Sequence, residues 1–261
     1  MRKLIPTQDT LITSKGYPFE RHRVVTDDGY ILEMHRMPHG RVPCRDPCHR
    51  QPILLMSGLL GDSSNYVLDF PKQSIGFILA DHKYDVWMGN VRGNTYGKKH
   101  RNLKSKSYEL ILFELFPRGA FYMNWAGKFC ALPTRSMCSL VGDMVANLGS
   151  KYMNELVTTA RPQKFDYGPE KNQLIYGQRE PAEYNLMNVR TDVGIFWSLG
   201  DHVITPDNVR ELIRDLGDRV KKDHFINDDY YTHAHFLMAM NNPDVLYGDF
   251  LSFLNRYATH T

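Results

Sequence analysis

The chain has 261 residues, of which 42% are hydrophobic and 23% charged, so it falls in the range of one globular domain that buries most of its apolar surface. Its 32 basic and 29 acidic residues give a net charge of +3 and are spread along the chain without a run of five like charges. This composition does not indicate nucleic-acid binding.

Apolar stretches and cysteines restrict the class of protein further. No stretch approaches the roughly 18 apolar residues that a membrane span needs. Polar residues 7–9 follow the short apolar start so closely that no signal peptide is expected. Two disulfides would suit a secreted protein and four free thiols a cytosolic one, and the spacing of the four cysteines leaves both open.

The first predicted elements form an antiparallel hairpin. Its strands cover Arg21–Thr26 and Tyr30–Met37, and the turn between them ends at Gly29, which supplies the positive φ. A loop from Pro38 to Arg50 then leads into the next strand.

A βαβ unit follows this loop. The apolar run Pro52–Met56 predicts a strand buried on both faces, as in a parallel sheet. Gly58 allows a sharp turn at its carboxyl end, whose N–H groups could hold an oxyanion. A helix over Ser74–Asp81 and a strand over Tyr84–Met88 complete the unit. The sequence therefore predicts an α/β fold with a mostly parallel sheet and a right-handed crossover.

The middle of the chain, from Tyr108 to about Ala160, is crowded with aromatic residues and has a helical pattern. One interpretation is ordinary hydrophobic core. We favour the other, a lid over an apolar substrate pocket, because these residues interrupt the sheet pattern.

The C-terminal part returns to alternating strands and helices. Asp201 follows the first of its strands, and a polar loop carrying His233 follows the second. The predicted elements are strands over Asp192–Leu199 and Lys221–Ile226, a helix from Pro206 to Leu216 capped by Thr205 and stopped by Gly217, and a helix from Pro243 to Tyr257 capped by Asn242.

Asp201 and His233 are two thirds of a nucleophile, acid, histidine triad in the order that α/β-hydrolases use. In that chemistry His233 would take the proton of the nucleophile, and Asp201 would hold the imidazole in the required tautomer. If each residue is considered singly, the simpler interpretation is that Asp201 is an ordinary turn acid and His233 an exposed loop histidine. Their paired positions favour the catalytic interpretation.

A metal site is a more distant alternative for the same loop. His233 and His235 would share one face of a strand, with Asp228 or Asp229 as a further ligand. A third ligand at suitable spacing is not evident, so we expect neither a metal nor a cofactor.

Short motifs lie across roughly residues 9–101 and 165–257. They are Gly16-Tyr17-Pro18, Thr26-x-Asp28-Gly29-Tyr30-Ile31-Leu32, Gly58-Leu59-Leu60, Ala80-Asp81, Tyr84-Asp85-Val86-Trp87, Gly89-Asn90, Arg92-Gly93-Asn94-Thr95, Phe165-Asp166-Tyr167-Gly168, Asp201 and Tyr231-x-His233. The run Arg92-Gly93-Asn94-Thr95 is the most specific of them. Together they resemble the acid lipases, the group of α/β-hydrolases that contains the gastric and lysosomal lipases.

The resemblance implies an α/β-hydrolase fold with a helical cap and the hydrolysis of triacylglycerols or cholesteryl esters. It implies a hydrolase core over residues 1–104 and 191–261, with the cap over 105–190. It also implies a lid disulfide between Cys130 and Cys138, an oxyanion-binding N–H at Leu59, and a secreted or lysosomal location. The expected partners are a lipid ester or fatty acid and a lipid surface.

One part of the family pattern is missing. No Gly-x-Ser-x-Gly elbow occurs in the chain, and the nearest runs, Gly61–Asn65 and Phe196–Gly200, each lack one of the glycines. Between Thr95 and Tyr108 the chain passes almost directly to lid-like sequence. The nucleophile strand, its helix and the next strand are therefore expected to be missing as a block from the centre of the sheet.

Three single positions also depart from the family. Ser57 stands where the family has His, Thr232 where it has Asn, and His235 where it has Asp. We predict a member of a lipid-ester hydrolase family with no identified nucleophile and no measurable lipase activity. The alternatives are a non-catalytic lipid-binding protein, and a truncated isoform or faulty gene model whose product does not fold stably.

Overall fold

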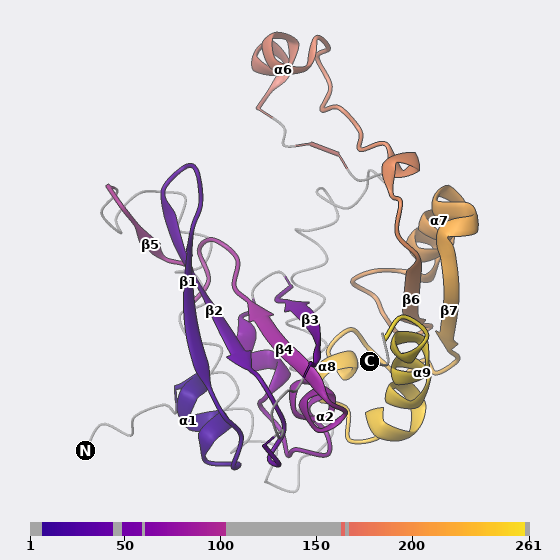
Figure 1. Cartoon of the computed structure of the whole chain (residues 1–261). Helices are drawn as coiled ribbons and strands as arrows, with labels where there is room; N and C mark the ends of the chain where they lie inside the picture. The colour runs from indigo at the N-terminus through magenta and orange to yellow at the C-terminus, as the bar shows by residue number, and fades with distance from the viewer. Residues whose placement is uncertain (1–6, 44–48, 59–60, 103–162, 165–166, 259–261) are drawn as a thin grey trace, which may run out of the picture. The chain divides into compact units, whose positions relative to one another are not determined.

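The computed structural model describes residues 7–43, 49–58, 61–102, 163–164 and 167–258 (Figure 1). These residues fall into two compact units, one formed by 7–102 with 237–258 and the other by 163–236. The first contains α1 (Gln8–Thr13), β1 (Glu20–Val25), β2 (Tyr30–Met37), β3 (Gln51–Met56), η1 (Ser63–Tyr66), α2 (Ile75–Asp81), β4 (Tyr84–Gly89), β5 (Lys99–His100), η5 (Pro243–Tyr247) and α9 (Gly248–Asn255). The second contains α6 (Pro169–Tyr176), η3 (Leu186–Asn188), β6 (Val193–Ser198), α7 (Pro206–Leu216), η4 (Gly217–Arg219) and β7 (Val220–Ile226), and α8 (His235–Met238) spans the boundary.

The sheet of the first unit is mixed, with strand order β1-β2-β4-β3 and β5 beside β2. β1 and β2 form the predicted hairpin, with Gly29 at a φ of +94° in its turn. β3 and β4 are parallel and are joined by α2, which is the predicted βαβ unit. β2 pairs with β4 in the antiparallel sense, so the prediction of a mostly parallel sheet is wrong for this unit. The reason is that the hairpin joins the βαβ unit directly.

The core of this unit lies between one face of the sheet and three helices. Met37, Val86 and Met88 project from β2 and β4 and are fully buried against Ile12 of α1 and Phe77 of α2. Three partly buried side chains of α9 pack against the same cluster, and they are Phe250, Leu251 and Leu254.

β3 is more exposed than predicted. Ile53 and Leu55 pack against the core, whereas Leu54 and Met56 on the opposite face are 53% and 51% exposed. Within the described residues β4 is the one strand that pairs with β3. The prediction of a strand buried on both faces is therefore wrong, because one face of β3 is about half exposed.

The C-terminal helix begins differently from the prediction. Its first turn, η5, is a π-helix, and α9 follows it directly. Asn242 stands at the predicted N-cap position, but it has helical dihedral angles and its side chain makes no capping hydrogen bond. It is instead fully buried, with its amide nitrogen 3.5 Å from the hydroxyl of Tyr247.

The second unit holds a two-stranded parallel sheet of β6 and β7, connected by α7. The predicted cap of α7 is confirmed, because Thr205 and Asn208 exchange side-chain and backbone hydrogen bonds in a capping box. The aromatic segment from Tyr108 to Ala160 lies outside the described residues. The segment boundaries at residues 104 and 190 therefore stay predictions.

Candidate active site

The ends of β6 and β7 bring the acid and the histidine loop together within the second unit. After β6, the N–H of Leu199 donates to the carbonyl of Ile226 and the N–H of Gly200 donates to the carbonyl of Asp228, both at 3.1 Å. A Cβ atom at Gly200 would lie 2.4 Å from the carbonyl oxygen of Asp229, so this approach requires glycine. Asp201 is the next residue.

Asp201 is 5% exposed, and both of its carboxylate oxygens have partners. Oδ1 accepts the N–H groups of Val203 and Ile204 at 2.9 Å each, while Oδ2 lies 2.8 Å from Nδ1 of His233. Burial by itself would raise the pKa of Asp201, but the hydrogen bonds from His233 and the two N–H groups outweigh it and lower that pKa. Asp201 is therefore both a turn acid and the partner of His233.

The hydrogen bond that His233 donates to the Asp201 carboxylate raises the pKa of His233, against a smaller opposing effect of burial. The imidazole is still 57% exposed. Since Nδ1 is held by the carboxylate, Nε2 is the nitrogen that remains to accept a proton from a reacting group. The pair has the geometry of a general base with its orienting acid.

Two further residues, which sequence reasoning missed, fix the loop that carries His233. The hydroxyl of Ser198, fully buried at the end of β6, donates to the carbonyl of Tyr231 at 2.5 Å. Nδ1 of His235 accepts the N–H of Thr232 at 3.0 Å. The position of Ser198 at a strand end was a signal in the sequence, but the partner of its hydroxyl depends on the packing of β6 beside the loop.

The serines of the two incomplete elbow runs form buried hydrogen bonds with other residues. Ser198 is bonded to Tyr231 as described, and Ser63 is fully buried with its Oγ 2.9 Å from Nδ1 of His35. This Ser63–His35 pair is a serine–histidine contact that the sequence did not suggest, and both side chains are closed to substrate. Neither serine is a surface nucleophile.

The turn after β3 is supported by buried asparagines of the first unit. The N–H of Gly61 donates to the carbonyl of Gly58 at 3.2 Å, and Nδ2 of Asn94 donates to the carbonyl of Gly61 at 3.3 Å. Asn90 accepts both Nδ2 of Asn94 and the N–H of Ser63 at 2.9 Å. Leu59, the predicted oxyanion donor, lies outside the described residues, so its role stays a prediction.

Three further features were considered from the sequence: a metal site, a disulfide and a membrane span. In the part of the chain that the structure describes, no group of three or more His, Cys, Asp or Glu side chains could hold a metal ion. Oδ1 of Asp228, one of the candidate ligands, accepts the N–H of Tyr230 at 2.8 Å. Cys130 and Cys138 lie outside the described residues. None of the described helices has the length and apolar character needed to cross a membrane.

Comparisons with known proteins agree with the motifs. A family model described as the partial alpha/beta-hydrolase lipase region matches residues 9–70. Lipase member M of Mus musculus is 48% identical over 103 residues, which are 40% of this chain and 24% of that protein. Gastric triacylglycerol lipase of Bos taurus is 45% identical and lysosomal acid lipase/cholesteryl ester hydrolase of Homo sapiens 47% identical, each over 40% of this chain and 26% of the relative.

The matched region therefore spans about a quarter of the length of these relatives. Over this region the chain is similar to the gastric and lysosomal acid lipases of the α/β-hydrolases, in agreement with its motifs.

Proposed function

We propose that this chain is a lipid-ester hydrolase homologue that keeps the acid and the histidine of a catalytic triad and lacks the serine nucleophile. The contact that carries this proposal is the one between Asp201 and His233, 2.8 Å long, with a buried carboxylate and an exposed imidazole. An isolated turn acid or an isolated loop histidine would not require that contact.

In this proposal each residue has a defined role. His233 would act as general base through Nε2, Asp201 would fix its tautomer and stabilise its cation, and the N–H of Leu59 would face the oxyanion. The substrates would be lipid esters of the triacylglycerol or cholesteryl ester class, as the names of the gastric and lysosomal relatives suggest. A secreted or lysosomal location would follow from the same kinship.

The missing elbow makes the chain inactive in this proposal. A serine hydrolase transfers the acyl group first to the serine and then to water, so without that hydroxyl no acyl-enzyme forms. Loss of the nucleophile from a triad removes roughly six orders of magnitude in rate. We therefore expect no lipase activity above background.

A serine-reactive fluorophosphonate probe tests this proposal on the purified full chain. The expected result is no stoichiometric labelling and no release of fatty acid from triolein or cholesteryl oleate. Stoichiometric labelling that disappears in His233→Ala, but persists in the exposed-histidine control His82→Ala, would show that a nucleophile is present.

Non-catalytic lipid binding is the second proposal, and the absence of an elbow favours it. Saturable binding of a fluorescent fatty acid by a chain that melts cooperatively would support it.

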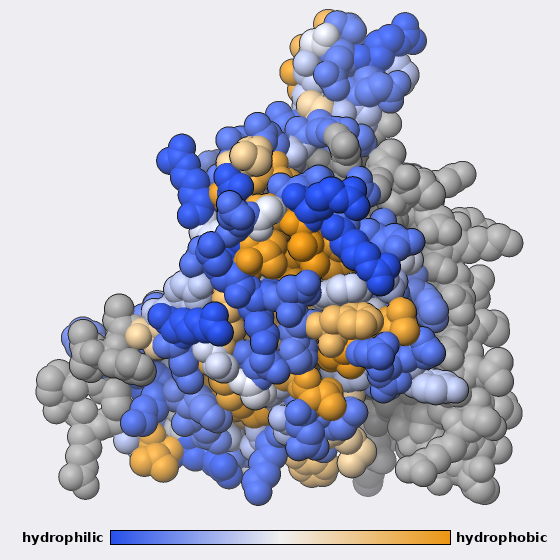
Figure 2. Space-filling view, turned by 90° about the vertical axis from the view of Figure 1, so that its right-hand side faces the viewer, coloured by the Kyte–Doolittle hydropathy of each residue, from blue (hydrophilic) through white to orange (hydrophobic). Residues whose placement is uncertain are grey.

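The exposed Leu54 and Met56 favour a third possibility, that the product does not fold stably. Apolar side chains also reach the surface in patches between polar ones in Figure 2. A broad, non-cooperative melt would support this third possibility.

A further inference from the structure

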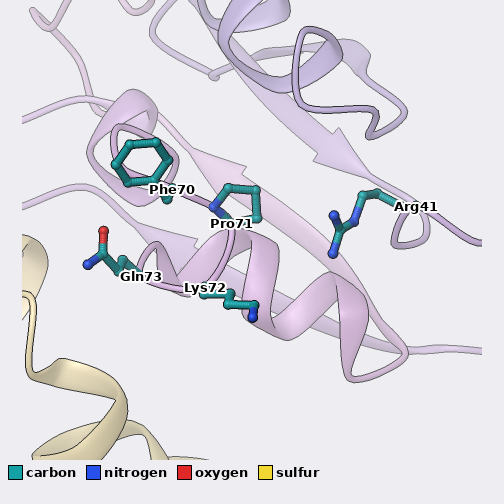
Figure 3. Close-up of a pocket in the computed structure, with 5 residues that line it drawn as sticks. All are labelled: Arg41, Phe70, Pro71, Lys72 and Gln73. Atoms are coloured by element: carbon teal, nitrogen blue, oxygen red, sulfur yellow. The ribbon is translucent and has the colours of Figure 1, made fainter.

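The first unit has a pocket of about 420 Å³ that the proposed chemistry does not use. It is lined by Arg41 and by four consecutive residues between η1 and α2, Phe70, Pro71, Lys72 and Gln73 (Figure 3). We call this pocket and its rim the Arg41–Lys72 surface.

The backbone at this surface is firmly held. Phe70 and Gln73 close a tight turn around Pro71, since the carbonyl of Phe70 accepts the N–H of Gln73 at 2.8 Å. The ammonium of Lys15 binds the three carbonyl oxygens of residues 67–69 at 2.5 to 3.4 Å. On the far side of the turn, the hydroxyl of Tyr247 donates to the carbonyl of Gln73 at 2.8 Å.

The side chains on this rigid turn are nevertheless open to solvent. Phe70 is 73% exposed, although its carbonyl accepts the N–H groups of both Gln73 and Ser74. Val42, which follows Arg41 directly, is 78% exposed. Two short segments of the first unit therefore each present an apolar side chain next to a basic one.

The charge at this surface is positive on balance. The ends of the Arg41 and Lys72 side chains turn toward the same space beside Pro71 (Figure 3). Two acids lie near: Asp81 pairs with Arg41 at 3.4 Å, and Asp69 is next to the ammonium of Lys15. Lys72 has no acidic partner among the described residues, so an anion placed between the two cations would relieve their repulsion.

We propose that the Arg41–Lys72 surface docks onto an anionic lipid surface, with a phosphate-bearing headgroup between Arg41 and Lys72 and with Phe70 and Val42 at the headgroup boundary. Basic residues beside exposed apolar ones are the composition that holds proteins at anionic membrane interfaces. The rigid turn supports this because little order has to be gained on binding. The choice of lipid as partner rests on the proposed function, but docking needs no ester hydrolysis.

Co-sedimentation with vesicles of ether-linked phospholipids tests the proposal, because these lipids contain no ester bond. The full chain is compared on vesicles of phosphatidylcholine type alone and on vesicles that also contain the phosphatidylserine type. We expect binding to the anionic vesicles that weakens at high salt. The affinity should fall about fivefold for each unit of charge changed, so about 25-fold for Lys72→Glu, which changes the charge by two units, and several-fold for Phe70→Ala.

Matched controls separate this surface from general charge and hydrophobicity. Lys98→Glu makes the same change of charge at an exposed position of the first unit, and Met240→Ala removes an apolar side chain that is 81% exposed there. Both should bind like the unchanged chain. Equal losses in the controls, absence of binding by a cooperatively folded chain, or full competition by free inorganic phosphate would each overturn the proposal. A nucleophile found by the fluorophosphonate probe would change the proposed function and leave this test unaffected.

Discussion

Nδ1 of His235 lies 3.0 Å from the backbone nitrogen of Thr232 and 2.8 Å from its hydroxyl oxygen. The N–H can only donate, so Nδ1 is unprotonated and the hydroxyl donates to it as well. The side chain of His235 therefore closes the turn that begins at Thr232 and carries His233.

Replacing His235 tests this contact. His235→Leu removes the acceptor and leaves the N–H of Thr232 without it, which should lower the free energy of unfolding by about 1 kcal/mol. His235→Asn places an amide oxygen near the position of Nδ1 and should recover most of that loss. Urea denaturation measures both variants, and equal losses in the two would show that the side chain stabilises the loop by packing alone.

The pKa of His233 gives a second prediction. Asp201→Asn keeps an oxygen for the N–H groups of Val203 and Ile204 but removes the charge, so the pKa of His233 should fall toward or below its ordinary value of 6.5. A proton NMR titration of the imidazole measures this. Asp207→Asn is the control, because that exposed acid of the same unit pairs with Arg210 and should leave the titration unchanged.

The same pair sets a pH window for its contribution to stability. Since folding raises the pKa of His233, the contribution of His233 is fully present below pH 6.5 and is lost as the pH rises through the pKa of the folded state. Since folding lowers the pKa of Asp201, its contribution is present above pH 3.8 and is lost at lower pH. The Asp201→Asn variant should therefore be most destabilised between these two values.

Sequence patterns predicted the elements whose signals are local. The capping box of α7 joins Thr205 to a residue three positions away, so a single turn of sequence contains it. The exposure of β3 depends instead on which strands lie beside it, and an apolar run cannot report that. Asn242 shows the same limit, because a good capping residue is here used for burial.

The candidate site also has features that the sequence predicted and features that depend on tertiary packing. The order of strand, acid, strand and histidine predicted that Asp201 and His233 would meet, because both follow parallel strands whose ends share one edge. The roles of Ser198 and His235 were not predicted, since each depends on a contact made after the strands have paired. The oxyanion role of Leu59 stays a prediction.

Two adjacent leucines of β3 test whether its outer face is uncovered. Leu55 packs against the core and Leu54 is 53% exposed, so the same substitution should have different costs. We expect Leu55→Ala to lower the free energy of unfolding by about 2 to 3 kcal/mol and Leu54→Ala by less than about 1 kcal/mol. Equal costs in urea denaturation would mean that other residues cover this face in solution.

His35 gives the last prediction, which concerns acid stability. It is fully buried, with Nδ1 2.7 Å from Oε1 of Gln8 and 2.9 Å from Oγ of Ser63. Its Nε2 has no hydrogen-bond partner among the described residues and lies 3.8 Å from a carboxylate oxygen of Glu33. Burial, opposed in part by Glu33, lowers the pKa of His35 to about 4.

The unfolded chain therefore takes up a proton on His35 near pH 6.5, whereas the folded chain takes it up only near pH 4. Stability from this residue is present above pH 6.5 and is lost as the pH falls toward 4, by about 3 kcal/mol in all at about 1.4 kcal/mol per pH unit. An acidic compartment would thus destabilise the first unit.

His35→Gln should remove most of this pH dependence, because glutamine keeps hydrogen-bonding groups near Gln8 and Ser63 and does not titrate. The measurement is urea denaturation of both chains at several pH values between 6.5 and 4. The unchanged chain should lose stability steeply over this range and the variant much less. Parallel curves would show that folding does not lower the pKa of His35 and would overturn this prediction.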